Sequence, residues 1–150
     1  MVHSVSYLYF PQGNQRLEAY YLGIMSSVPF DWYIRRVIEL YFSVDLFNAC
    51  PFPKPSENDP LRLRVVELAG RLAAVDERYA EWAEAVDVPV ASANDDSVKS
   101  ELIAELDAAV GLLYGLDESD LKKIWETFHP TTDHLSNLDE VLAHHRNLQG

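Results

Sequence analysis

Five basic side chains in the first half of the chain have residue types and spacing suited to binding phosphate. Arg35 and Arg36 are adjacent, Lys54 lies between two prolines, and Arg62 and Arg64 follow shortly after. Because guanidinium and ammonium groups neutralise nucleic-acid phosphates, we predict these five residues as DNA contacts. The competing interpretation is that they form ion pairs with nearby acids. Those acids are Asp31, Glu39, Asp45 and Glu67.

One pair of residues has a spacing used by metal sites, the Glu-x-x-His pair Glu126 and His129. Carboxylate-bridged di-iron sites need two such pairs and two further glutamates on facing helices. His144 and His145 are adjacent, so on a helix they point about 100° apart and cannot bind one ion together. We therefore expect no metal site, and we expect His145 to face the protein core.

Glu101, Glu105 and Asp107 are the acids closest to a general acid–base arrangement. Such chemistry needs a desolvated pocket, whereas the helical pattern places these acids opposite an apolar stripe, on the solvent-exposed face. Cys50, the single cysteine, has no base beside it in the sequence, and there is no glycine-rich phosphate loop. We therefore predict that the chain is not an enzyme by itself.

Charge is distributed unevenly along the chain, whose net charge is −12. Residues 1–55 carry four basic and four acidic side chains, and residues 56–150 carry eight basic and twenty acidic ones. Carboxylates repel phosphates, so only the first third and the start of the next helix are expected to face DNA.

Composition indicates a globular protein outside the membrane. Hydrophobic residues make up 48% of the chain, which is ample for a core. No apolar run approaches the roughly 20 residues that cross a bilayer, and the N-terminus lacks the features of a signal peptide. A single cysteine excludes a disulfide framework within the chain. We expect a cytoplasmic protein with no membrane partner.

Two short strands are predicted near the N-terminus. Residues 5–10 and 41–48 are rich in aromatic and β-branched side chains, which favours strands. The prolines of residues 51–55 fix φ and bias the preceding residues away from helix, so this segment is predicted to be extended.

Two helices are predicted between these strands. Residues 17–27 and 30–40 carry apolar side chains at intervals of three and four, and Pro29 separates the two segments. Gly23 lies inside the first helix, where it costs about 1 kcal/mol relative to alanine. We interpret it as a point of close packing.

A single long helix is predicted from residue 60 to residue 88. Asp59 is a favourable N-cap, and Pro60 occupies the preferred first position. Alternating intervals of three and four then connect a seam of apolar residues. The seam consists of Leu61, Val65, Leu68, Leu72, Val75, Tyr79, Trp82 and Val86. It is interpreted either as one core-facing stripe of a bundle or as a dimerising coiled coil, and the first is favoured.

The remainder is predicted to be a loop followed by three helices. Residues 89–97 are small, polar and acidic, which favours a flexible loop. A helix over residues 102–113 is closed by Gly115, a short helix is capped by Asp117, and a last helix is capped by Ser136.

Several stretches match one protein family in order over nearly the whole chain. They are Glu18–Ser27, Pro29–Arg36, Asn48–Pro55, Asp59–Leu72, Asp76–Trp82, Ile103–Asp107, Leu113–Leu116 and Trp125–Phe128. Through them the chain resembles the C-terminal region of N6-adenine DNA methyltransferases from type IIG restriction–modification systems and from DISARM- and BREX-like phage-defence systems. It departs from the family after Phe128, where residues 130–133 replace a glycine–aromatic segment.

The resemblance implies the distal half of a target-recognition domain, followed by a helical spacer and tail. In this family an upstream domain binds S-adenosylmethionine and acts on a flipped adenine through an Asn-Pro-Pro-Tyr-type motif. The chain has no such motif. The resemblance therefore implies no cofactor in this chain, S-adenosylmethionine in the partner, and two partners: a methyltransferase catalytic domain or subunit, and DNA.

The predicted fold class is mainly α (α+β), with short β elements of a partial target-recognition domain, a long helix and a C-terminal helical bundle. The predicted units are residues 1–55 for recognition, 56–88 for the spacer helix, 89–97 for the loop and 98–150 for the C-terminal helices. The predicted function is a non-catalytic DNA target-recognition and scaffold portion of an adenine methyltransferase. The alternative is an acidic helical protein-interaction or assembly module that does not contact DNA.

Overall fold

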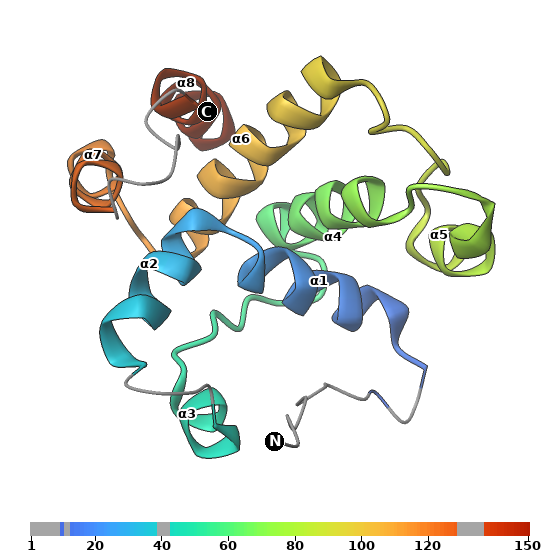
Figure 1. Cartoon of the computed structure of the whole chain (residues 1–150), viewed down its shortest axis with the longest axis horizontal. Helices are drawn as coiled ribbons and strands as arrows, with labels where there is room; N and C mark the ends of the chain where they lie inside the picture. The colour runs from blue at the N-terminus through green and yellow to red at the C-terminus, as the bar shows by residue number, and fades with distance from the viewer. Residues whose placement is uncertain (1–9, 11–12, 39–42, 129–136) are drawn as a thin grey trace, which may run out of the picture.

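The computed structural model describes residues 10, 13–38, 43–128 and 137–150, and every regular element in these residues is helical (Figure 1). The mainly α part of the fold prediction is therefore confirmed. The elements are α1 (Gln15–Met25), α2 (Val28–Val37), α3 (Val44–Ala49), α4 (Pro60–Ala73), the 3-10 turn η1 (Glu77–Tyr79), α5 (Ala80–Val86), α6 (Asp96–Leu113), α7 (Glu118–Thr127) and α8 (Leu138–Gln149).

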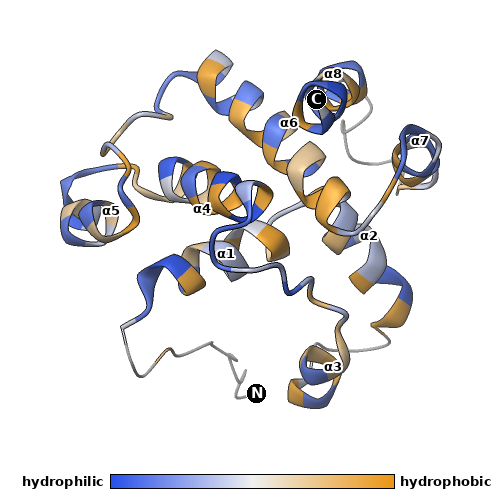
Figure 2. Cartoon of the chain, turned by 180° about the vertical axis from the view of Figure 1, so that it is seen from behind, coloured by the Kyte–Doolittle hydropathy of each residue, from blue (hydrophilic) through white to orange (hydrophobic). Residues whose placement is uncertain are grey.

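Helix α6 is the centre of the arrangement. It packs against α4 and against α8, and α1 packs on α4. Helix α5 lies at one end of the molecule and α7 and α8 lie at the other, as both views show (Figures 1 and 2). One core cluster lies between α1, α4, α5 and α6, and a second lies between α6, α7 and α8 with the start of α2. Helix α6 therefore contributes side chains to both clusters.

The strand predicted over residues 41–48 is wrong where the structure describes it, because residues 44–49 form α3. The Ser43 hydroxyl accepts the Leu46 N–H at 3.1 Å and caps this helix. Val44 is 66% exposed, so the alternating pattern does not mark a buried sheet face. A strand needs neighbours to pair with, and the described residues supply none. The other predicted strand lies outside the described residues, apart from Phe10, which is not in a strand.

The two predicted helices of the first third are confirmed, with shifted ends. Helix α1 covers residues 15–25 and α2 covers residues 28–37. The Ser27 hydroxyl caps α2, and Pro29 lies inside its first turn, where the missing N–H of proline is tolerated. Residues 51–55 contain no helix, in agreement with the extended prediction.

The predicted long helix is broken. Asp59 caps α4 and Pro60 begins it, as predicted, but the helix ends at Ala73. The Asp76 carboxylate accepts the Arg78 N–H at 3.0 Å and caps the next turn, η1, before α5 begins. Because the seam is interrupted here, it does not form one coiled-coil helix. On α4 its residues face the core, as the favoured interpretation predicted.

The segment predicted as a flexible loop makes specific contacts with α4. The Ala91 N–H donates to the Ala74 carbonyl at 2.7 Å. Within it Ala93 is buried, and Val90 packs against the first core cluster. The segment is also shorter than predicted, because Asp95 caps α6 and the helix begins one residue later.

The ends of the C-terminal helices follow their sequence signals where these are described. Gly115 has φ +71° just after α6, a conformation that glycine adopts without strain. Asp117 and Asp120 form a capping box at the start of α7. Ser136, the predicted cap of the last helix, lies outside the described residues, and Asn137 occupies the N-cap position of α8.

Gly23 of α1 lies directly against side chains of α4. A Cβ atom at this position would lie 2.6 Å from Cγ1 of Val65 and 3.2 Å from Cβ of Ala69. Val65 is fully buried, so the added methyl group cannot be accommodated by turning a side chain into solvent. The interpretation of Gly23 as a close-packing position is confirmed.

Replacing Gly23 with alanine is expected to destabilise the protein by up to about 2 kcal/mol. Overpacking a core costs about 1–3 kcal/mol, and the better helix propensity of alanine returns about 1 kcal/mol. Urea unfolding followed by circular dichroism measures the difference. The double variant Gly23→Ala/Val65→Ala should be less destabilised than the sum of the two single variants, and simple additivity would contradict the proposed clash.

None of the described helices combines the length and the apolar character that crossing a membrane requires.

Candidate nucleic-acid interface

Two of the predicted DNA-contacting arginines lie where the end of α2 meets the end of α7. The guanidinium carbon of Arg35 lies 5.3 Å from the ring centroid of Phe128. Arg36 lies over the Trp32 ring at 3.6 Å and donates to Thr127 Oγ1 at 3.3 Å. Trp32 Nε1 donates to the same hydroxyl oxygen at 2.9 Å. These contacts bring the last turns of the two helices together.

Both helices are anchored from beneath by buried residues. The Val28 N–H at the start of α2 donates to the Asp107 carboxylate of α6 at 2.8 Å. In α7 the buried side chains are Leu121, Ile124 and Trp125. The anchored faces therefore point to the core, and the arginines remain on the outside.

The charge at this junction is less negative than in the chain as a whole. Arg35 pairs with Asp31 at 2.9 Å, and both side chains are more than one-third exposed. Arg36 makes no ion pair with a carboxylate of the described residues. Lys123 precedes Thr127 by one helical turn and is exposed. We call Trp32, Arg35, Arg36, Lys123 and Thr127 the α2–α7 surface.

Lys54 and Arg62 lie together at a second place, near the start of α4. Arg62 donates to the Pro55 carbonyl at 3.1 Å and lies 5.2 Å from the ring centroid of Tyr20. The Tyr20 hydroxyl donates to the Pro53 carbonyl at 3.0 Å, and burial raises the pKa of Tyr20 to about 12. Lys54 is exposed. Among the described residues, no hydrogen bond or ion pair joins this pair to the α2–α7 surface.

Arg64 is separated from the other predicted contacts and is engaged by carboxylates. Its Nε and Nη2 donate to the two oxygens of Glu105, each at 2.7 Å, and Nη1 donates to Glu67 at 2.6 Å. Burial by itself would raise the pKa of Glu105, but the hydrogen bonds from Arg64 and the attraction of nearby positive groups, Arg64 first, together outweigh it and hold that pKa below its ordinary value. The pKa of Arg64 is raised, and its hydrogen bonds to Glu105 are the largest cause. This guanidinium therefore joins α4 to α6.

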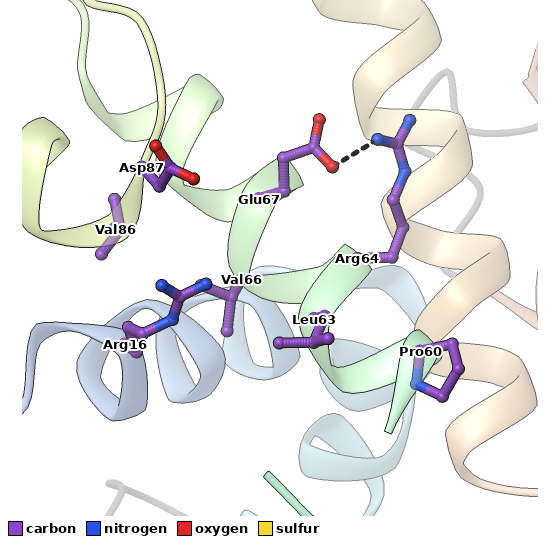
Figure 3. A pocket seen from close by; sticks show the side chains of 8 residues that line it. All are labelled: Arg16, Pro60, Leu63, Arg64, Val66, Glu67, Val86 and Asp87. Carbon is purple, nitrogen blue, oxygen red and sulfur yellow. Dashed lines mark hydrogen bonds and ion pairs between the residues drawn. The ribbon is translucent and has the colours of Figure 1, made fainter. Parts of the chain in front are cut away.

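A hollow of about 350 Å³ lies between α1, α4 and the end of α5, and Arg64 is one of the residues that line it. Figure 3 shows the side chains around it. Arg16 lies across the hollow from Arg64, whose side chain extends toward α6. Glu67 and Asp87 also line the hollow. The two basic and two acidic side chains balance, so the hollow does not favour an ion of either sign.

The prediction that Glu105 and Asp107 face solvent is wrong. The Glu105 side chain is only 13% exposed, and Asp107 is 1% exposed. Helix α6 is covered on two sides, by α4 and by α8, so burial extends well beyond its stripe of large apolar residues. Ile103, which the stripe places inward, is 37% exposed instead.

Asp107 is the most perturbed carboxyl group of the described residues. Desolvation raises its pKa to about 7, and the hydrogen bond from the Val28 N–H opposes this shift. Its second oxygen, Oδ2, has no hydrogen-bond partner among the described residues. The group positions the start of α2 and is not open to a substrate.

The histidines and Cys50 do not form a reactive group in the described part of the chain. No three His, Cys, Asp or Glu side chains there are placed to hold a metal ion, and His129 lies outside the described residues. His145 is buried as predicted, with Nε2 at 2.9 Å from the Leu116 carbonyl. Burial raises the pKa of the Cys50 thiol, which contacts the Leu46 carbonyl at 3.2 Å. A protonated thiol is a poor nucleophile.

Sequence reasoning missed the α7 half of the interface. Thr127 has no sequence signal, because its relevance comes from contact with Trp32 and Arg36, more than 90 positions earlier. Lys123 matters only through its place one turn before Thr127. The burial of Asp107 does have a signal: alanines at 104, 108 and 109 lie close to it in the sequence of the helix. Small residues on the face opposite a large apolar stripe indicate packing on both sides.

Searches of protein-family models, of curated proteins and of solved structures each find no match to this chain.

Proposed function

We propose that this chain is a non-catalytic DNA-contacting portion of an adenine-N6 DNA methyltransferase of a restriction–modification or phage-defence system. Its role is to hold DNA for a catalytic domain that binds S-adenosylmethionine and is supplied separately. The sequence resemblance over residues 18–128 supports the class of system. The α2–α7 surface supports the DNA contact.

The observation that carries the proposal is the concentration of free and weakly paired cations at the α2–α7 junction. Arg36 has no carboxylate partner among the described residues, and the Arg35–Asp31 pair is exposed. An exposed pair of this kind is worth about 0–1 kcal/mol, so a phosphate can displace Asp31 at little cost. Arg64, by contrast, is held by two carboxylates. The proposal therefore rests on Arg35 and Arg36, with Lys54 and Arg62 as a separate, secondary contact.

A gel shift of the full chain with duplex DNA over a range of salt concentrations tests the proposal. Replacing Arg35 and Arg36 with alanine is expected to lower affinity by about tenfold at low salt, equally for unrelated sequences. The slope of log affinity against log salt should fall by about 2, one unit for each phosphate that is no longer neutralised. Arg35→Lys/Arg36→Lys should keep most of the slope.

The matched control changes two other exposed arginines, Arg78 and Arg146. They pair with Asp76 and Glu118 in other parts of the fold, and their replacement with alanine alters net charge by the same amount. This control is expected to keep the wild-type slope. An equal fall in affinity for both double variants would show a nonspecific charge effect and contradict a defined interface.

The second candidate function is an acidic protein-interaction module without DNA contact. It is favoured by the net charge of −12, all of which comes from residues 56–150. The same gel shift separates the candidates, because this module would bind no DNA at any salt concentration. Co-purification with a methyltransferase subunit from the host would support the first candidate.

A further inference from the structure

A small aromatic pocket lies directly beside the α2–α7 surface. Trp32 and Tyr33 of α2 line it, together with Tyr114 at the end of α6 and the rings of Pro29 and Pro51. Trp32 belongs to both features, because it lines the pocket and carries the Arg36 guanidinium at 3.6 Å. A ligand in the pocket would therefore lie next to an exposed cation.

The size of the pocket limits what it can hold. Its volume is about 160 Å³, and an apolar protein cavity of about 150 Å³ is large enough to bind benzene. One six-membered ring therefore fits the space. Aromatic walls favour a flat ring, because such side chains stack on planar groups.

The charges around the pocket favour a ring attached to an anion. The described residues that line it include no acid, although the chain has 24 acidic residues. Two other hollows each contain two carboxylates, Glu67 and Asp87 in one and Glu101 and Glu140 in the other, whereas a third, of about 170 Å³, contains none. A pyrimidine nucleotide combines a single ring with a phosphate, whereas an aromatic side chain of a partner protein carries no such charge.

We propose that this pocket accepts one unpaired pyrimidine base of the DNA strand whose phosphates contact Arg35 and Arg36. The inference rests on the proposed DNA contact and adds to it a site for an extrahelical base. Trp32 and Tyr33 supply stacking surfaces, and the phosphate next to the base lies against Arg36.

Tyr114 contributes its ring to the wall of the pocket. Its hydroxyl oxygen is buried and has no hydrogen-bond partner among the described residues, so it is closed to a ligand in the pocket.

The experiment compares three duplexes of about 20 base pairs by fluorescence anisotropy with the full chain. One is fully paired, one carries a single unpaired thymidine at its centre, and one carries an abasic nucleotide at the same place. Base stacking on aromatic residues implies that the thymidine bulge binds about 5- to 150-fold more tightly than the paired duplex. The abasic bulge should bind like the paired duplex.

Two pocket variants and one control define the site. Tyr33→Leu is expected to abolish the preference for the thymidine bulge and to leave affinity for the paired duplex unchanged. Tyr114→Phe keeps the ring that lines the pocket and should therefore keep the preference. Tyr79→Leu changes a 41% exposed tyrosine of η1 and should keep the full preference.

Each contrary result has a distinct meaning. If the paired duplex binds through Arg35 and Arg36 but the thymidine bulge gives no advantage, the pocket inference fails and the proposed function stands. An abasic bulge as tight as the thymidine bulge assigns the preference to DNA bending and also overturns the inference. If N-acetylphenylalanine amide binds in the pocket and thymidine 5′-monophosphate does not, the occupant is a protein side chain. If none of the duplexes binds, both proposals fail.

Discussion

The free energy of unfolding of the wild-type protein is expected to fall by up to about 4 kcal/mol as pH rises from 4 to 7, and Asp107→Asn is expected to abolish this fall. Asp107 is buried, and burial raises its pKa to about 7 in the folded protein. In the unfolded chain an aspartate has a pKa of about 3.9. A difference of about three pKa units corresponds to this free energy.

The direction of the effect follows from which state holds the proton. Between the two pKa values the folded protein keeps the proton on Asp107 and the unfolded chain has released it, so rising pH favours unfolding. The stability that protonated Asp107 contributes to the folded protein is fully present below pH 4 and is lost as pH rises through 7. Asparagine keeps an oxygen that can accept the Val28 N–H, which binds to Asp107 at 2.8 Å in the wild type, and it does not titrate.

The measurement is the free energy of unfolding in urea for wild type and Asp107→Asn at several pH values from 4 to 8. The difference between the two proteins isolates this group, because the paired carboxylates of Glu105 and Glu118 titrate equally in both. The exposed Asp45 is the matched control, and Asp45→Asn should show no such pH dependence. A constant difference between wild type and Asp107→Asn would mean that Asp107 is not buried as described.

Replacing Trp125 with alanine is expected to destabilise the protein by about 3–5 kcal/mol, the range for large aromatic residues in a core. Trp125 is 1% exposed and lies in the second core cluster, between α6, α7 and α8. Its Nε1 donates to Oδ1 of Asn137 at 3.1 Å. The side chain thus fixes α7 to the start of α8 as well as filling the core.

The functional consequence of this change concerns the α2–α7 surface. Arg36 and Trp32 contact Thr127, two residues after Trp125, so a displaced α7 removes one side of that surface. Trp125→Ala should therefore lower DNA affinity about as much as Arg35→Ala/Arg36→Ala, provided that the protein is assayed where it remains folded. Urea unfolding gives the stability, and the gel shift gives the affinity.

Controls separate the loss of packing from the loss of a tryptophan. Trp125→Phe keeps most of the apolar volume and should cost less than half as much as Trp125→Ala. Trp82→Ala removes a half-exposed indole on α5 that donates to Glu18 at 3.2 Å, and it should cost clearly less. Equal destabilisation by the Trp125 and Trp82 variants would contradict the central role of Trp125.

The two parts of the structure that bear on function depend on one helix. Helix α6 provides Asp107 to the start of α2 and packs with α8 beside α7. It is followed directly by Tyr114, which lines the aromatic pocket. The acidic C-terminal part of the chain therefore serves as the support on which the charge-balanced first third is placed. This arrangement suits a module that offers one limited face to a polyanion.

Sequence determined the features that depend on neighbours within a few positions. The caps at Ser27, Asp59 and Asp117 and the turn at Gly115 are local features, because capping joins a side chain to a backbone group two or three residues away. Helical periodicity correctly predicted α1, α2 and the core face of α4. Gly23 was correctly interpreted as a contact, since glycine within a helix is costly and is kept where space is short.

Tertiary structure decided the features that depend on distant partners. Residues 44–49 are helical because no neighbouring strand is present among the described residues, and an alternating sequence becomes a strand only by pairing. Asp107 and Glu105 are buried because α4 and α8 both cover α6, which one apolar stripe could not indicate. Arg64 donates to Glu105, which lies 41 positions away in the sequence, and Arg36 donates to Thr127, which lies 91 positions away. Packing decides which basic side chains pair with carboxylates inside the protein and which stay available for a ligand. Ion pairs form only between groups that the fold brings within a few ångströms.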